Sequence, residues 1–146
     1  MSVSKFNHEG YYDPTTYEAL TNIEAEERKA KFRPLVFICS PFSRNEQTNI
    51  ENARRYCRFA VDRGYAPFAP HLFFPQFMDD AVSEERENGI FMGIIMLTKC
   101  AELWVFARSP GGGDRISKGM AQEIRKAESR SMPIRYFTTD CEEVEV

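Results

Sequence analysis

The sequence predicts one α/β domain with a mostly parallel sheet between two layers of helices, and three observations support this class. Apolar runs alternate with helical patterns in the order strand, helix, strand, helix, strand, helix, strand, which favours parallel pairing through right-handed crossovers. The run Leu35–Cys39 is apolar throughout, as expected of a central strand buried on both faces. The length of 146 residues fits one sizeable core. We expect a three-layer, flavodoxin-like or Rossmann-like domain over residues 34–146.

Residues 1–33 precede this pattern and are expected to form an N-terminal extension. Thr16–Phe32 is a charged helical stretch that follows a turn or helix start at Asp13-Pro14-Thr15. Its apolar residues are spaced three apart before charge takes over: Tyr17, Leu20 and Ile23. The sequence leaves two interpretations open. The stretch packs as an amphipathic helix on the domain or on a partner, or it is a solvated arm.

The first half of the domain contains two expected strands. Leu35–Cys39 is ended by Ser40-Pro41-Phe42-Ser43, and apolar residues then recur at helical spacing over Asn45–Arg63. Gly64 supplies the stop of that helix. Tyr65–Phe68 is a short second strand, and the prolines beside it favour an edge position in the sheet.

The second half of the domain is expected to contain two helices and two strands. Glu84–Lys99 is a helix whose apolar part, Ile90–Leu97, is long enough to contact both the sheet and another element. Trp104 belongs to a strand and is expected in the core. The other expected segments are an aromatic loop at His71–Ser83, a strand at Glu102–Phe106, a glycine-rich loop at Arg108–Arg115, a helix at Ser117–Ser129, a strand at Pro133–Phe137 and a polar tail at Thr138–Val146.

Composition narrows the possible partners. The net charge of −3 argues against a nucleic-acid-binding protein, which would carry a basic face, but leaves room for a single nucleotide. Four widely spaced cysteines and two histidines make a zinc site unexpected and favour buried free thiols. No signal peptide or membrane-spanning run is evident, so a reducing, cytoplasmic setting is expected. Neither a metal nor an organic cofactor is implied.

Three loops should meet at one edge of the sheet, because ligands of open α/β folds bind outside the carboxyl ends of the strands. These loops are Ser40–Asn49, Pro70–Asp80 and Ala107–Glu123. The first precedes a helix, whose N–H groups and dipole can hold an anion. Its candidate contacts are Ser40, Ser43, Arg44 and Asn49. The alternative is that Ser43 or Asn45 only caps the helix.

The second loop offers polar and aromatic candidates. Asp79 and Asp80 can bind hydroxyl groups or simply end a loop. His71 can act as an acid or base or be a packed, hydrogen-bonded residue. Most of the surrounding phenylalanines are expected in the core, with one or two free to stack on a base: Phe42, Phe68, Phe73, Phe74 and Phe77.

The third loop leads into the last helix. Ser117 is a plausible N-cap, and Gly119 allows a ligand to approach the backbone closely. Glu123 lies one and a half turns from the start of the helix, so its carboxylate can still face the crevice. Most helical glutamates are instead solvated.

Several segments together resemble the nucleoside 2-deoxyribosyltransferase-like superfamily, and most closely a small branch found in phages and bacteria. The resemblance runs from Pro34 to Phe137. It is carried by Phe37-Ile38-Cys39-Ser40-Pro41-Phe42-Ser43, Asn49-Ile50-Glu51-Asn52-Ala53, Gly64-Tyr65-Ala66-Pro67-Phe68-Ala69-Pro70-His71, Cys100-Ala101-Glu102-Leu103-Trp104-Val105-Phe106, and Ile116-Ser117-Lys118-Gly119-Met120 with Glu123.

This resemblance implies a function. In the characterised relatives a glutamate at the position of Glu123 attacks the anomeric carbon of a deoxynucleoside, and another base or water resolves the glycosyl-enzyme. Related nucleotide N-glycosidases hold a 5′-phosphate at positions that match Ser40, Ser43 and Ser117. Met120 belongs to the same matched segment and is included among the substrate-binding candidates. Relatives also build their sites across subunit interfaces, which together with Ile90–Leu97 predicts a homo-oligomer, a dimer or larger.

The chain also departs from the transferases. They carry an aspartate where Ser117 stands, and another in the helix region occupied here by Gly89 and Gly93. An acid for the leaving base would have to come from Asp79, Asp80 or Asp114. The expected function is N-glycosidic bond cleavage or deoxyribosyl transfer. The alternatives are a non-catalytic nucleotide-binding or sensing module and a phage-type interaction protein on the same scaffold.

Overall fold

A computed structural model describes residues 14–42, 45–108 and 113–145 of the chain. It divides into two compact units, Met1–Arg33 and Pro34–Val146, which are described separately. The first unit contains α1 (Pro14–Ala30), a helix of 17 residues. The sequence stretch expected to be helical, Thr16–Phe32, thus forms a helix that begins and ends two residues earlier.

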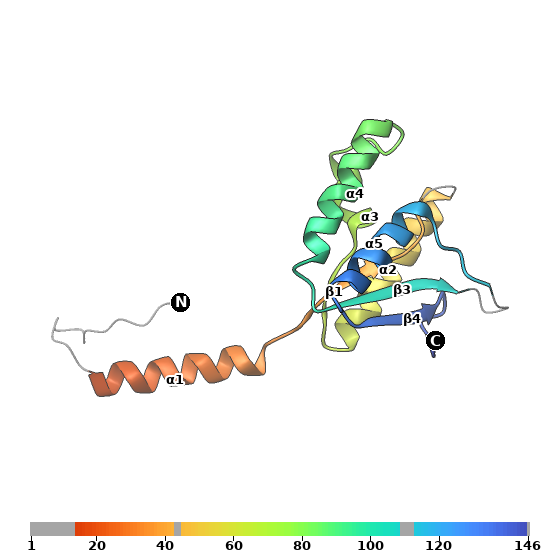
Figure 1. Cartoon of the computed structure of the whole chain (residues 1–146). Coiled ribbons are helices and arrows are strands. Elements are labelled where there is room, and N and C mark those ends of the chain that lie inside the picture. The colour runs from red at the N-terminus through yellow and green to blue at the C-terminus, as the bar shows by residue number, and fades with distance from the viewer. Residues whose placement is uncertain (1–13, 43–44, 109–112, 146) are drawn as a thin grey trace. The chain divides into compact units, whose positions relative to one another are not determined.

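The second unit alternates strands and helices, as Figure 1 shows. Each of the four predicted strands and three predicted helices of this unit forms within two residues of its expected bounds. The elements are β1 (Leu35–Cys39), α2 (Glu46–Asp62), β2 (Ala66–Phe68), α3 (Pro70–Phe73), the 3₁₀ turn η1 (Phe74–Gln76), α4 (Ser83–Leu97), β3 (Glu102–Arg108), α5 (Lys118–Ser129), β4 (Ile134–Thr138) and β5 (Glu143–Val144).

The five strands form one sheet in the order β2-β1-β3-β4-β5. The first four pair in parallel, and β5 pairs antiparallel with β4. This is the strand order of flavodoxin-like folds, so the predicted class is confirmed. Strand β2, whose middle residue is Pro67, lies at an edge, as its prolines predicted.

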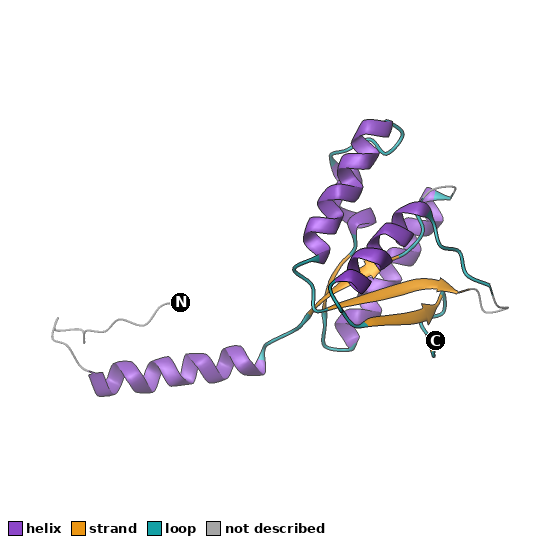
Figure 2. Ribbon diagram, in the orientation of Figure 1, coloured by secondary structure: helices purple, strands orange, loops and turns teal. Residues whose placement is uncertain are grey.

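Side chains of β1 alternate between the two faces of the sheet, and each face has its own core. On one face, Val36 and Ile38 pack with Tyr56 and Ala60 of α2. On the other, Phe37 and Cys39 pack with residues of α4 and α5, including Leu97 and Met120. Figure 2 shows α2 and α5 on opposite sides of the strands. The domain therefore has the three layers that the alternating pattern predicted.

Two segments differ from the sequence-based expectation. The aromatic loop begins with the helical turns α3 and η1, because Pro70 and Pro75 each stand where a helical turn can accept a proline. Of the five phenylalanines of which most were expected in the core, Phe73 and Phe77 are exposed. The polar tail contains β5, whose Glu143 pairs in register with Phe137 of β4.

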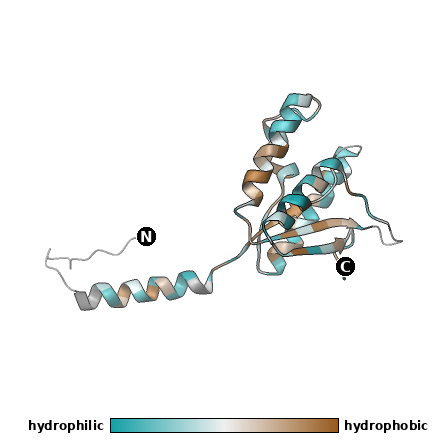
Figure 3. Ribbon diagram, in the orientation of Figure 1, coloured by the Kyte–Doolittle hydropathy of each residue, from teal (hydrophilic) through white to brown (hydrophobic). Residues whose placement is uncertain are grey.

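The C-terminal half of α4 is apolar on its outer face as well as its inner face. Figure 3 shows this half in brown, and Phe91, Ile95 and Met96 are exposed there. Gly93 and Leu97 on the opposite face are buried against the domain. Among the described residues, no helix is long and apolar enough to cross a membrane.

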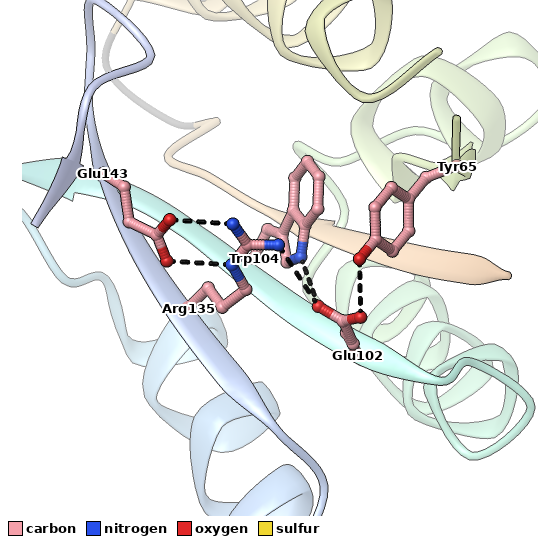
Figure 4. Close-up of polar contacts among 5 residues, drawn as sticks. All are labelled: Tyr65, Glu102, Trp104, Arg135 and Glu143. Carbon is pink, nitrogen blue, oxygen red and sulfur yellow. Dashed lines mark hydrogen bonds and ion pairs between the residues drawn. The ribbon is translucent and has the colours of Figure 1, made fainter. Parts of the chain in front are cut away.

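A polar network fixes β5 to the sheet (Figure 4). The Arg135 guanidinium donates two hydrogen bonds to Glu143, of 2.8 and 2.7 Å. It also lies over the Trp104 ring, 5.0 Å from its centroid. Glu102 accepts hydrogen bonds from the Trp104 indole at 3.0 Å and the Tyr65 hydroxyl at 2.9 Å. The polar groups that these five residues place against the aromatic core thus have partners.

Candidate active site

A cavity of about 620 Å³ lies beside the first turns of α5. Its walls come from α4, from the amino end of α5 and from the segments that follow β1 and β2. Strand order reverses between β1 and β3, and ligands of such sheets bind outside the carboxyl ends at that point. A second cavity of about 60 Å³ adjoins it. Both are lined by Phe42, His71, Asp80, Arg86, Ile90 and Glu123.

Glu123 is the most unusual group in the cavity wall. Only 6% of its surface is exposed, because α5 turns this face of its second turn toward α4 and the sheet. Burial penalises the charged form and raises the pKa of Glu123 from 4.5 to about 7. Near neutral pH, Glu123 is therefore present in both its protonated and its ionised form. In either form its carboxyl group lines the cavity.

The Cys39 thiol interacts with this carboxyl group. Cys39 ends β1 and is fully buried, and its Sγ lies 3.9 Å from the carbonyl oxygen of Met120, to which it donates. Its interaction with Glu123 opposes part of the rise in the glutamate pKa. Burial and the nearby carboxylate raise the pKa of Cys39 well above its ordinary value, so the thiol stays protonated and can donate. The other three cysteines are free and only partly buried, so the expectation of buried thiols holds in full for Cys39 alone.

His71 is held in a defined orientation. Its Nε2 lies 2.7 Å from the carbonyl oxygen of Ser40, and its ring stacks on Phe42 with centroids 4.7 Å apart. A carbonyl oxygen only accepts, so Nε2 carries the proton. Burial lowers the pKa of His71, which favours the neutral ring. Nδ1 then keeps its lone pair, and the residue is an acceptor rather than an acid.

The amino end of α5 contributes three of the predicted site residues: Ser117, Gly119 and Met120 line the larger cavity. The Ser117 hydroxyl accepts a hydrogen bond from the Met120 N–H at 3.2 Å, so the predicted N-cap is confirmed. A Cβ added at Gly119 would meet Ile90 at 3.6 Å, an ordinary contact. Crowding by neighbouring protein atoms therefore does not require glycine there.

Three other predicted site residues, Ser40, Asn49 and Asp79, are not part of the cavity walls. Ser40 is buried, and its hydroxyl has no partner among the described residues. The Asn49 side chain donates to the carbonyl of Phe42 at 2.8 Å, which shapes the turn after β1. The Asp79 carboxylate accepts from the Ala81 N–H and closes the loop before α4. Asp80 is the one of the two aspartates that lines both cavities. Ser43 and Arg44 fall outside the described residues.

Sequence reasoning missed Arg86 of α4, which lines both cavities. An arginine on a helix carries no local signal, and only the packing of α4 beside α5 brings it near Glu123. The larger cavity also gains residues from the outer parts of α4 and α5: Glu87, Phe91, Ile94, Lys118 and Gln122. Its wall thus combines aromatic and aliphatic surface with charges of both signs. The described residues contain no group of three side chains suited to hold a metal ion.

Comparison with known proteins identifies a family and solved structures of similar fold. No curated protein matches the sequence. A solved structure of a 2-deoxyribosyltransferase from the bacterium Bacillus psychrosaccharolyticus is similar, with a TM-score of 0.52 and 15% identity. The match covers 71% of this chain and 72% of that one, and at this identity it establishes a shared fold. A family model described as a domain of unknown function, DUF7768, matches residues 34–137. The chain therefore belongs to the DUF7768 family.

Proposed function

We propose that the unit Pro34–Val146 cleaves the N-glycosidic bond of a nucleoside or nucleotide, with Glu123 as the nucleophile, and that residues 1–33 are an extension outside this activity. One observation carries the proposal. Glu123 is a nearly buried carboxyl group that lines a cavity at the ligand-binding edge of the sheet. No ion pair of Glu123 is found among the described residues, and the side chain that acts on its carboxyl group is the thiol of Cys39.

The cavity suits a nucleoside in size and in chemistry. Its volume of about 620 Å³ falls within the range of roughly 300–1,000 Å³ typical of small-molecule sites. Ile90 and Ile94 supply apolar surface for a base, and Arg86 and Lys118 are cations that can approach an anionic substituent. The amino end of α5 supports the same role, since helix N-termini favour anions.

The reaction needs a carboxylate beside the sugar. In its ionised form, an oxygen of Glu123 attacks C1′ as the bond from C1′ to the base nitrogen breaks, and the base leaves with the electron pair. Asp80 is the candidate that supplies a proton to the leaving base, because it lines the cavity with Glu123. Asp79 closes a loop, and Asp114 is paired with Arg108 at 3.0 Å. A new bond at C1′, to water or to another base, then frees Glu123.

Base release tests this function directly. The protein is incubated with a panel of 2-deoxynucleosides and their 5′-monophosphates, and free base is measured by chromatography. We expect release from at least one substrate, and loss of that release in Glu123→Gln, which keeps the shape of the side chain but is not a nucleophile.

Glu128→Gln is the matched control, since Glu128 is an exposed glutamate on the same helix. It should leave release unchanged. Ligand-induced thermal stabilisation without any free base would contradict catalysis and favour a binding or sensing module. The absence of both responses would favour an interaction protein.

We also propose that the chain pairs with a second copy of itself through α4. Exposed residues recur every three or four positions along one side of this helix, at Glu84, Asn88, Phe91 and Ile95, and the exposed Lys99 follows in the turn after its end. The stripe is apolar in the middle, acidic at its start and basic at its end. An antiparallel pair of such helices would bury Phe91 and Ile95 and bring Glu84 opposite Lys99 of the other copy. The stripe is therefore complementary to itself.

Substitution of Phe91 by aspartate is expected to convert a dimer to a monomer, because the charge would be buried at the centre of the contact. Analytical ultracentrifugation measures the change. Phe77→Asp is the matched control, because Phe77 is exposed to a similar degree, 62% against 64%, but lies outside α4. A wild-type chain that is monomeric at high micromolar concentration would contradict the pairing.

A further inference from the structure

His71 and Glu123 line the same two cavities, and this pairing bears on the second half of the proposed reaction. A glycosyl-enzyme formed on Glu123 must be released by a nucleophile. Water is a poor nucleophile unless a base removes its proton as it attacks. Apart from His71 and the glycosylated Glu123 itself, the cavity walls contain three carboxyl groups able to accept a proton, which are Asp80, Glu85 and Glu87.

The geometry of His71 fits the role of a base. Its Nε2–H is committed to the Ser40 carbonyl at 2.7 Å. Its ring is fixed against Phe42 with an interplanar angle of 11°, so the imidazole has little rotational freedom. The lone pair of Nδ1 has no partner among the described residues. A general base needs an available lone pair, a fixed direction and access to the reacting water. The contacts of His71 with Ser40 and Phe42 leave Nδ1 available and fix the ring. Access to water follows because His71 lines the cavity.

We propose that His71 is the general base that activates water for hydrolysis of the glycosyl-enzyme, which makes the protein a hydrolase rather than a transferase. This inference rests on the proposed function of Glu123. In the step, Nδ1 takes a proton from water while the water oxygen bonds to C1′. The bond between C1′ and the Glu123 oxygen breaks, and its electron pair returns to the carboxylate. The imidazolium then passes its proton to solvent.

The chemical state of His71 agrees with this role. Burial lowers its pKa, although the hydrogen bond to Ser40 and the charge of Asp80 act in the opposite direction. The neutral ring, which a base requires, is thus the form favoured at neutral pH. A general acid at this position would need the opposite shift. His71 is therefore suited to accept a proton in the second step rather than to donate one in the first.

The substitution His71→Gln distinguishes formation of the glycosyl-enzyme from its hydrolysis. The amide N–H₂ of glutamine can still donate to the Ser40 carbonyl, but glutamine has no basic lone pair comparable to Nδ1. We expect steady-state release of base to fall about a hundredfold or more. A rapid first release of one base per chain should remain, and mass spectrometry should detect the sugar attached at Glu123. Azide should restore turnover, because this anion attacks C1′ without losing a proton.

His8→Gln is the matched control, since His8 is the only other histidine of the chain, and it should release base at the wild-type rate. Three outcomes are distinct. Wild-type chain that releases no base overturns the proposed function and this inference with it. Release that is unchanged in His71→Gln overturns the role of His71 alone. Slower release with no attached sugar and no azide rescue also overturns it, because the first step is then the one affected.

Discussion

Glu123→Gln should make the folded protein more stable above pH 7, by up to roughly 3 kcal/mol, and should leave its stability near pH 4.5 almost unchanged. The reason is burial. The pKa of Glu123 rises from 4.5 to about 7 on folding, so the folded state holds this proton more tightly than the unfolded state does. A difference of about 2.5 between the two pKa values corresponds to that free energy.

The sign of this change in stability follows from the linkage between protonation and folding. A group whose pKa is raised on folding favours the folded state at low pH, and this contribution is lost as pH rises from about 4.5 to about 7. Above that window the wild-type protein carries the full cost of a buried carboxylate. Glutamine keeps the size of the side chain and never ionises, so the variant does not bear this cost.

Urea unfolding at a series of pH values measures the effect. The useful quantity is the difference in unfolding free energy between variant and wild type, because the other carboxylates titrate alike in both proteins. Glu128→Gln should show no such window, since Glu128 is exposed on the same helix. A constant difference between Glu123→Gln and wild type from pH 4 to about 8 would contradict the raised pKa.

Trp104→Ala should cost about 3–5 kcal/mol of stability, the largest loss expected from a single side chain of this domain. Trp104 is fully buried. Its ring contacts Tyr65 and Phe137, with centroids 4.6 and 5.0 Å apart. Alanine would leave a cavity between β3, β4 and α2 and would remove the surface on which Arg135 lies. For a domain of marginal stability, this loss approaches the whole free energy of folding.

Trp104→Phe separates packing from hydrogen bonding. Phenylalanine retains most of the aromatic contact and loses only the bond from the indole N–H to Glu102, so we expect a cost of about 1–2 kcal/mol. Unfolding is best followed by circular dichroism, because Trp104 is the only tryptophan. Phe77→Ala, at an exposed aromatic residue, should change stability by less than about 0.5 kcal/mol. Equal losses for Trp104→Ala and Phe77→Ala would contradict the assignment of the core.

The main elements of the fold were predictable because they are encoded locally. Leu35–Cys39 has no polar residue and becomes a strand covered on both faces. The strand β5 was not predictable, because it has only two residues, one of them charged, and its pairing depends on the contact between Arg135 and Glu143 across the turn. Which of the phenylalanines are exposed, Phe73 and Phe77, could not be predicted for a related reason. Aromatic composition favours burial on average, but the short helical turns there leave these two rings without a covering element.

The candidate site was predictable only in part. The position of Glu123, one and a half turns from the start of α5, left its carboxylate able to face the crevice, and the residue is buried there. The contact between Cys39 and Glu123 joins residues far apart in the sequence, and periodicity within one element cannot find it. Arg86 was missed because its relevance depends on how α4 packs against α5. Asn49 and Asp79 were included from loop position alone, and their side chains are used to shape backbone turns.

The two residues of β5 have a consequence for how the domain behaves at high concentration. Without them, β4 would present a row of free N–H and C=O groups to any extended chain, and such edges recruit foreign strands into aggregates. The antiparallel pairing of Tyr136 with Val144 occupies part of that row. Glu143 adds a charge at the boundary, held in place by Arg135. Strand β5 therefore protects part of the β4 edge from pairing with strands of other chains.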